Sequence, residues 1–136
     1  MKTMSEMIEI HSHDDAGFKR MVEYKAWVAA LLNDCEMYTP EKVSYFQKHM
    51  LTDEVFILLS GKCTLFEAGD GEHPGRITPC PLEPMKLYNV KAGVWHTHLL
   101  APGTKVVVVE NSDTGLANSP IEDLTPEQKQ IMADLF

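Results

Sequence analysis

Short apolar segments separated by turn-forming residues fill the chain from residue 43 to residue 111, and they limit the folds that it can adopt. The clearest is Val55 to Leu59, an apolar run of strand length that stops at Ser60-Gly61. The candidate strands are residues 43–47, 55–59, 62–67, 85–90 and 106–109. Many short strands at turn-spaced intervals are typical of a barrel or a sandwich. We therefore expect an all-β, antiparallel fold.

The connections between these strands follow from their turn residues. Residues 62–67 alternate apolar and polar side chains directly after Ser60-Gly61, which predicts a hairpin turn at these two residues. Residues 69–75 are rich in Gly, Asp and Pro, and three further prolines follow at positions 79, 81 and 84. This composition predicts an irregular surface loop.

The two ends of the chain differ from its centre. Residues 1–16 show no sustained period, which indicates an N-terminal arm or a short edge strand, and residues 18–32 suit a helical face and a strand face equally well. In segment 125–136, Thr125 has the properties of an N-cap, Pro126 stands at the first helical position and Gln128 follows. We therefore expect a short C-terminal helix over 126–136.

Length and charge restrict the function. A chain of 136 residues has room for one core, so we expect a single domain over 1–136. The 12 basic and 20 acidic residues leave a net charge of −8, which disfavours nucleic acid and anionic membrane surfaces as partners. The two arginines, Arg20 and Arg76, offer little capacity for bidentate clamps, which also disfavours a polyanionic substrate.

The cysteines and the N-terminus indicate a cellular compartment. Cys35, Cys63 and Cys80 are odd in number and show no CxxC spacing, so we expect neither a disulfide framework nor a zinc knuckle. The N-terminus soon turns acidic without an apolar stretch, and no apolar run is long enough to span a membrane. These features predict a cytoplasmic protein with reduced thiols.

Four side chains with metal-ligand chemistry fall near the predicted strands. Gln47 and His49 are two residues apart, so an extended strand points both to one face. His49 and Glu54 would face opposite ways on one straight strand, so a turn over residues 50–53 must bring them to one interior on neighbouring strands. His96, from a later hairpin, can then close the site. Imidazole and carboxylate ligands suit a divalent ion such as Zn, Fe, Mn, Ni or Cu.

These residues resemble the cupin superfamily, small β-barrels recognised by two motifs. The first motif has the form G-x5-H-x-H-x(3 or 4)-E-x6-G. This sequence matches it with Gln47-x-His49-x4-Glu54-x6-Gly61, where Gln47 stands in place of the first His. The second motif has the form G-x5-P-x-G-x2-H-x3-N, and the sequence matches it with Lys91-x-Gly93-x2-His96, where Lys91 replaces Pro and Leu100 replaces Asn. The resemblance covers about residues 43–111. It implies a jelly-roll-like cupin barrel in which residues 18–32 are strand. It also implies a metal held by His49, Glu54 and His96, with Gln47 in the position of the fourth ligand.

Within the cupin resemblance, two classes of function stay open. One is a metal-dependent isomerase, lyase or dioxygenase that acts on a small neutral or singly charged metabolite, such as a sugar or a keto acid, with His98 or Glu54 moving protons. The other is a non-enzymatic barrel, with weak metal binding or none, that binds or senses a small molecule. Fold alone does not choose between them.

A second resemblance is confined to residues 93–100, which are similar to the Gly-x-Trp-His-His-Pro-Leu stretch of ureidoglycolate lyases. It implies His96 or His98 as a general base. Arg20 and Lys48 are then the candidates for holding the substrate carboxylate. Tyr45, Phe46, Phe56 and Trp95 are candidate pocket residues, although aromatic residues at alternating strand positions more often belong to the core. We also expect a homodimer, because cupins commonly pair through edge strands and the N-terminal arm is suited to exchange with a partner subunit.

Overall fold

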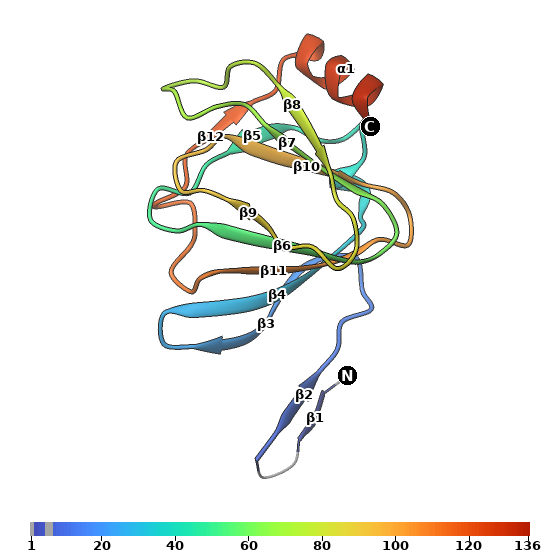
Figure 1. Cartoon of the computed structure of the whole chain (residues 1–136), viewed down its shortest axis with the longest axis vertical. Coiled ribbons are helices and arrows are strands. Elements are labelled where there is room, and N and C mark those ends of the chain that lie inside the picture. The colour runs from blue at the N-terminus through green and yellow to red at the C-terminus, as the bar shows by residue number, and fades with distance from the viewer. Residues whose placement is uncertain (1, 5–6) are drawn as a thin grey trace.

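Two five-stranded antiparallel sheets lie face to face in the computed structural model of this chain, which describes residues 2–4 and 7–136 (Figure 1). One sheet, which we call the β4 sheet, has the order β3 (Gly17–Tyr24), β4 (Trp27–Asn33), β11 (Lys105–Asn111), β6 (Glu54–Ser60) and β9 (Tyr88–Val90). The other, the β10 sheet, has the order β12 (Ile121–Asp123), β5 (Tyr45–Gln47), β10 (His96–Leu100), β7 (Cys63–Glu67) and β8 (Thr78–Pro81). A short 3-10 helix, η1 (Glu36–Tyr38), follows β4. The predicted all-β, antiparallel architecture is confirmed.

The main core fills the space between the two sheets. Strand β11 shows how the chain builds it, because Val106 and Val108 are buried while Val107 and Val109, on the other face, are half-buried. The core residues of this cluster are Ala30, Leu32, Phe56, Leu58, Cys63, Leu65, Leu82, Leu100, Val106 and Val108. Each large apolar side chain buried in this way contributes about 1.5–3 kcal/mol relative to exposure.

A second, smaller cluster lies on the outer side of the β10 sheet, under helix α1 (Pro126–Leu135). Met132 of the helix is fully buried against residues that include Phe46, Phe66 and Leu99. Thr125 caps the helix, because its hydroxyl accepts from the backbone N–H of Gln128 while the Gln128 side chain accepts from the Thr125 N–H. The predicted C-terminal helix and its N-cap are confirmed.

The predicted hairpin at Ser60-Gly61 is wrong. Strand β6 belongs to the β4 sheet and β7 to the β10 sheet, so the chain crosses between sheets at this point. Gly61 has a φ of +82°, and an added Cβ would lie 2.5 Å from the Cα of Thr104. Only glycine meets both conditions without strain. Strand β7 is also buried on both faces, not on one, because its outer side packs under α1.

Part of the segment that the prolines predicted to be an irregular surface loop is a β-strand. Pro79 and Pro81 lie within β8, which pairs with β7 at the edge of the β10 sheet. Proline is tolerated in an edge strand because the free edge needs no N–H donor. The following strand, β9, begins only at Tyr88, whereas the sequence pattern predicted it from Met85.

Residues 18–32 are strand, as the cupin resemblance implied. They form most of β3 and β4, which pair with each other around a turn at Lys25-Ala26. Lys25 has a φ of +51° in this turn. The local pattern of residues 18–32 suits a helix and a strand equally well, and pairing with neighbouring strands decides for the strand.

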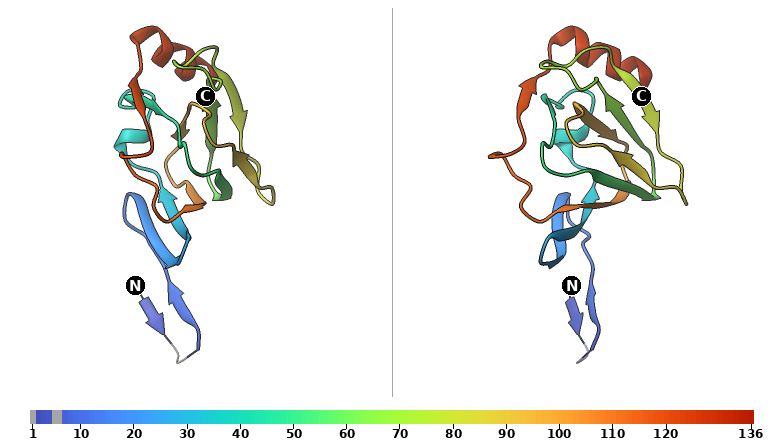
Figure 2. Two further views of the ribbon diagram at one scale, coloured as in Figure 1. Left: turned by 90° about the vertical axis from the view of Figure 1, so that its left-hand side faces the viewer. Right: turned by 60° about the vertical axis from the view of Figure 1, so that its left-hand side comes forward.

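The N-terminal segment forms an arm that extends away from the barrel, opposite to α1 (Figures 1 and 2). Strands β1 (Lys2–Met4) and β2 (Glu9–His11) pair in a two-stranded sheet of their own. The sequence pattern predicted an arm or a short edge strand over 1–16, and the described part of that segment contains these two paired strands, while residues 1, 5 and 6 lie outside the described residues. In the described part of the chain, no helix has the length and apolar character needed to cross a membrane.

Candidate metal centre

Three of the four predicted ligands come together between the two sheets. His49 lies two residues after β5, Glu54 is the first residue of β6, and His96 is the first residue of β10. His49 and His96 therefore come from the β10 sheet side and Glu54 from the β4 sheet. His49 and Glu54 do face one interior, but from opposite sheets and not from neighbouring strands of one sheet.

The loop over residues 50–53 is held in place at both ends. Asp53 accepts hydrogen bonds from the Asn89 amide and from the Ala92 backbone N–H, at 2.9 and 2.8 Å. The Thr52 hydroxyl accepts from the backbone N–H of Asn111 at 3.0 Å. The backbone carbonyl of His49 also accepts from the N–H of Gly93, which ties this loop to the segment before His96.

The ligand atoms of the three residues lie within 4.8 Å of one another, and all three side chains are buried. Oε1 of Glu54 is 3.1 Å from Nε2 of His49 and 2.9 Å from Nε2 of His96. The two imidazole rings meet edge to face, with centroids 5.1 Å apart. Two imidazoles therefore converge on one carboxylate oxygen.

The outer nitrogens of both rings decide which atoms face the centre. His96 Nδ1 is 2.9 Å from the Val94 carbonyl oxygen, which can only accept, so Nδ1–H donates. The Ser119 hydroxyl donates to Oδ1 of Asn118 and so accepts from His49 Nδ1–H at 2.7 Å. In neutral imidazoles, both Nε2 lone pairs then point toward the Glu54 carboxylate.

The pKa of Glu54 reflects this arrangement. Burial by itself raises the pKa of the carboxyl, but the hydrogen bonds from His49 and His96 outweigh it and hold the pKa well below the ordinary value. Glu54 is therefore ionised and needs positive charge beside it.

The donor set fits a divalent metal ion. Oε1 of Glu54 lies 3.1 and 2.9 Å from the two Nε2 atoms, and imidazole nitrogens and carboxylate oxygens are the ligands that divalent ions such as Zn²⁺ take in proteins. Hydrogen bonds donated by the outer nitrogens hold both rings in the orientation seen for metal-bound histidines. His49, Glu54 and His96 would hold the ion.

Gln47, the fourth predicted ligand, borders the same interior. Its backbone pairs with His96 in β10 and with Ile121 in β12, and its side chain lines the cavity described next. Its role as a ligand stays a prediction.

A cavity of about 260 Å³ opens beside the three residues. Its lining consists of Phe18, Leu32, Tyr38, Tyr45, Gln47, His49, Glu54, Phe56, His98, Val108, Glu110, Thr114, Gly115, Leu116 and Ser119. Tyr45 and Phe56 line it as expected, whereas Phe46 and Trp95 pack in the cluster under α1. No Lys or Arg is among the described residues that form this lining.

A second cavity, of about 500 Å³, lies on the other side of His96, between the edge strands β8 and β9. His96 borders it, while His49 and Glu54 do not. The smaller cavity is therefore the one that reaches most of the polar groups of the centre.

His98 points into the smaller cavity from β10, two residues after His96. Its ring lies between Tyr38 and Phe56, with centroid distances of 4.7 and 5.8 Å. Burial lowers the pKa of His98 to about 4, so the ring is neutral at neutral pH. Both ring nitrogens are buried without a hydrogen-bond partner, and a catalytic role for His98 stays a prediction.

Three residues of the centre were missed by the sequence interpretation. Glu110 lines the cavity, and its buried, unpartnered Oε1 lies 3.9 Å from His49 Nε2. Burial, followed by the charge of Glu54, raises the pKa of Glu110 to about 8. Ser119 orients His49, and Tyr38 packs on His98. A signal was available for Glu110, which follows Val106 and Val108 in the inward alternation of β11.

The two candidate carboxylate anchors lie outside the cavity. Arg20 donates to the Ser112 carbonyl and pairs with Glu23. Lys48 donates to the Gly71 carbonyl, with its ammonium 4.6 Å from the centre of the Trp95 ring. The ureidoglycolate-lyase interpretation therefore lacks the anchor that it needs among the described residues of the cavity lining.

No known protein-family profile matches the chain, and no curated protein sequence matches it. Solved structures do match. A Streptomyces PAC13 variant with uridine superposes with a TM-score of 0.56 at 10% identity, covering 85% of each chain. A cupin-2 domain protein of Shewanella frigidimarina superposes with a TM-score of 0.51 at 22% identity, and the match covers 73% of this chain and 84% of the other. KdgF from a Halomonas species superposes with a TM-score of 0.53 at 12% identity, and the match covers 76% of this chain and 90% of the KdgF chain.

These likenesses show the fold. The arrangement of two facing antiparallel sheets with a C-terminal helix is that of the cupin barrel, which confirms the fold that the motifs implied.

Proposed function

We propose that this chain is a metal-dependent enzyme that moves protons on a small neutral or singly charged metabolite, such as a sugar or a keto acid. The proposal depends on one observation, the convergence of His49 Nε2, Glu54 Oε1 and His96 Nε2 in a buried position beside a cavity. Three electron-pair donors that meet call for a cation. A divalent ion such as Zn, Fe, Mn or Ni, when bound, would polarise a carbonyl or hydroxyl group of the substrate.

His98 is the residue that we propose to transfer the proton. Tyr38 and Phe56 hold its ring, so its position is set without using either nitrogen. A neutral imidazole with two unpartnered nitrogens offers one donor and one acceptor to a substrate. Glu54 was the other candidate, but its Oε1 already lies between two imidazoles, which favours a ligand role.

The charge of the cavity lining supports the substrate class. Glu54 is ionised, whereas Glu110, with its pKa raised to about 8, is mostly protonated at neutral pH. The Lys or Arg that would hold a phosphate or a carboxylate is missing from the described lining. A metabolite with hydroxyl or carbonyl groups can use the unpartnered atoms of His98 and Glu110. PAC13 has been solved with uridine, a neutral molecule that bears hydroxyls, so uridine belongs in the first set of compounds to test.

Elemental analysis of the purified protein tests the metal site. We expect about one divalent ion per chain, lost in His49→Ala and in His96→Ala because each change removes a ligand. His73→Ala is the matched control, since His73 is exposed, bonds to Glu122 and is not one of the three clustered residues. A protein that stays free of metal after supplementation contradicts the proposal and favours a binding or sensing barrel.

Hydrogen exchange in D₂O tests the chemistry even while the substrate is unidentified. Sugars, keto acids and uridine are incubated with the metal-loaded protein, and solvent deuterium at carbon is followed by NMR. A His98→Ala variant should keep the metal and slow the exchange by about 100-fold or more. Equal exchange rates in the two proteins would remove His98 from the mechanism.

A further inference from the structure

Glu110 is a buried acidic residue that neither cupin motif includes. It follows Val106 and Val108 in the inward alternation of β11, and its side chain is 7% exposed. Its Oε1 is buried without a hydrogen-bond partner and lies 3.9 Å from Nε2 of His49. A buried acceptor that stays unpaired costs about 1–3 kcal/mol. The unpaired oxygen beside the metal centre therefore indicates that Glu110 binds a further group there.

The register of the β4 sheet places Glu110 beside Glu54. Val109 of β11 pairs with Val55 of β6, so the next residue of β11, Glu110, and the preceding residue of β6, Glu54, are neighbours across the two strands. Both side chains are buried on the inner face of the sheet. Like charges that lie opposite each other in a sheet destabilise it. Two acidic residues at neighbouring inward positions therefore call for a cation between them.

The described lining of the cavity includes no Lys or Arg that could serve as this cation. The histidines of the centre do not replace it when their rings are neutral. His49 and His96 each donate a hydrogen bond from the outer nitrogen Nδ1, so Nε2 of each ring is an acceptor. A divalent metal ion is a cation that takes electron pairs from imidazoles and carboxylates together.

We propose that Glu110 is a fourth protein ligand of the metal ion. The side of the β10 sheet then supplies two imidazoles, His49 and His96, and the β4 sheet supplies two carboxylates, Glu54 and Glu110. Metal ligands bind in their deprotonated form, so the two carboxylates balance the charge of a divalent ion in a buried position. The assignment rests on the proposed metal site. It uses Oε1 of Glu110 for the ion and leaves His98 to the substrate.

Gln47, which holds the position of the fourth ligand in the first motif, is the alternative. Its side chain lines the cavity, but the residue is half-buried and its amide is neutral. Ligand charge raises the affinity of a metal site. The carboxylate of Glu110 is therefore the stronger candidate. Two carboxylates also make the donor set richer in oxygen, which suits Mn²⁺.

Titration of the metal-free protein with Mn²⁺, followed by the EPR signal of the free ion, measures the dissociation constant. Glu110→Gln keeps the shape of the side chain and removes its charge. It should raise the dissociation constant about 100-fold or more, because loss of an outer-shell partner alone costs about 10- to 100-fold. Gln47→Ala should have a smaller effect. Glu83→Gln, at an exposed carboxylate that pairs with Lys86, is the matched control and should leave the dissociation constant unchanged.

The Tm of each metal-free variant shows whether it folds. Glu110→Gln should leave this Tm equal or higher, because it removes an acidic group beside Glu54. If it does not fold, Glu110→Asp replaces it, since it withdraws the carboxylate by one methylene and should also weaken the binding of Mn²⁺. A folded Glu110 variant that binds Mn²⁺ as tightly as the native chain, or a larger loss in Gln47→Ala, overturns the role of Glu110. A native chain that binds neither Mn²⁺ nor Zn²⁺ overturns the metal site of the proposed function itself.

Discussion

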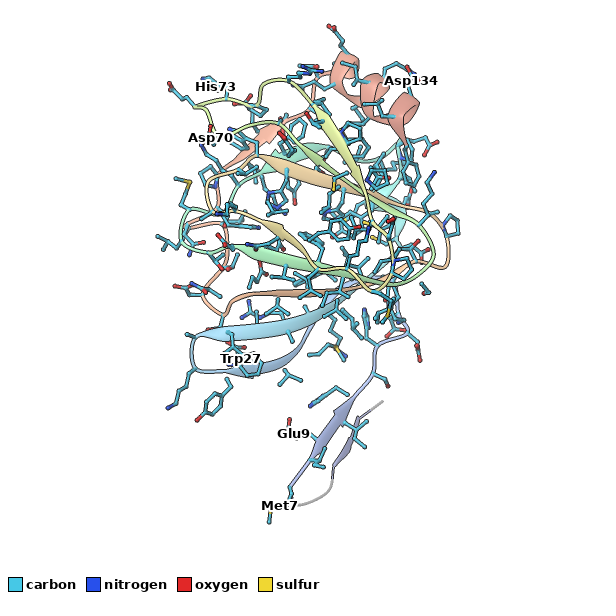
Figure 3. The ribbon with its side chains drawn as sticks, in the orientation of Figure 1. Met7, Glu9, Trp27, Asp70, His73 and Asp134 are labelled. Atoms are coloured by element: carbon cyan, nitrogen blue, oxygen red, sulfur yellow. The ribbon has the colours of Figure 1, made fainter. Side chains whose placement is uncertain are left out.

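At the scale of single residues, histidine–carboxylate pairs have different effects in this chain according to their burial. His49 and His96 meet Glu54 in a buried site, where the orientation of each ring is set by its other nitrogen. His73 meets Glu122 at the surface, at 2.6 Å, with its side chain 70% exposed (Figure 3). Solvent screens the surface pair, so its effect is on the proton affinity of His73 more than on stability.

This surface pair gives a prediction for pH dependence. The hydrogen bond to Glu122, and then its charge, raise the pKa of His73 above the ordinary value of 6.5. Because the folded pKa is the higher one, the stability that the pair adds is fully present below pH 6.5 and is lost as the pH rises through the raised pKa. An NMR titration should give a midpoint for His73 above 6.5 and a midpoint near it in Glu122→Gln. Identical midpoints in the two proteins would contradict this assignment.

The residues of the centre could be predicted to different extents. His49, Glu54 and His96 follow from two motifs whose spacings are encoded locally. Glu110 and Ser119 reach the same centre from distant parts of the chain, and no local pattern links them to His49. Inward alternation would have indicated the direction of Glu110 on β11, but not what it faces, because that depends on how the two sheets are stacked.

At the scale of elements, the strands were largely predictable and their partners were not. Alternation and turn residues located β6, β7 and β11 within one or two residues. They could not show that β6 and β7 lie in different sheets, because a turn with glycine serves a hairpin and a crossing between sheets equally well. The strand at Pro79 and Pro81 was missed for a similar reason, since only its place at the sheet edge makes proline acceptable.

The crossing at Gly61 gives a prediction at this scale. Gly61→Ala must place a side chain in left-handed backbone and against the Cα of Thr104, so we expect a loss of about 3 kcal/mol or more in the free energy of unfolding. Gly69→Ala is the matched control, because Gly69 has a similar φ of +78° with no atom within 4 Å of an added Cβ. Gly69→Ala should lower the free energy of unfolding by about 1–2 kcal/mol. Urea denaturation measures both, and equal losses would show that the close approach to Thr104 does not matter.

At the scale of the whole molecule, the two sheets share one core but differ in the residues that they direct inward and in what covers their outer faces. The β10 sheet carries His96 and His98 and is closed on its outer side by α1. The β4 sheet carries Glu54 and Glu110 inward, and no helix of the described residues packs on its outer side. The three residues that would hold an ion thus come from both sheets, so a bound ion would link the two layers.

Metal binding should therefore stabilise the whole fold and not a single loop. An ion that binds the folded chain alone, at 100 times its dissociation constant, adds about 2.7 kcal/mol to the free energy of unfolding. For a chain of 136 residues this raises the Tm by about 8 °C, and a chelator should reverse the rise. His49→Ala should show neither effect, because it leaves two of the three ligands. Calorimetry at one protein concentration measures both effects, and an equal rise in His49→Ala would place the stabilising ion elsewhere on the molecule.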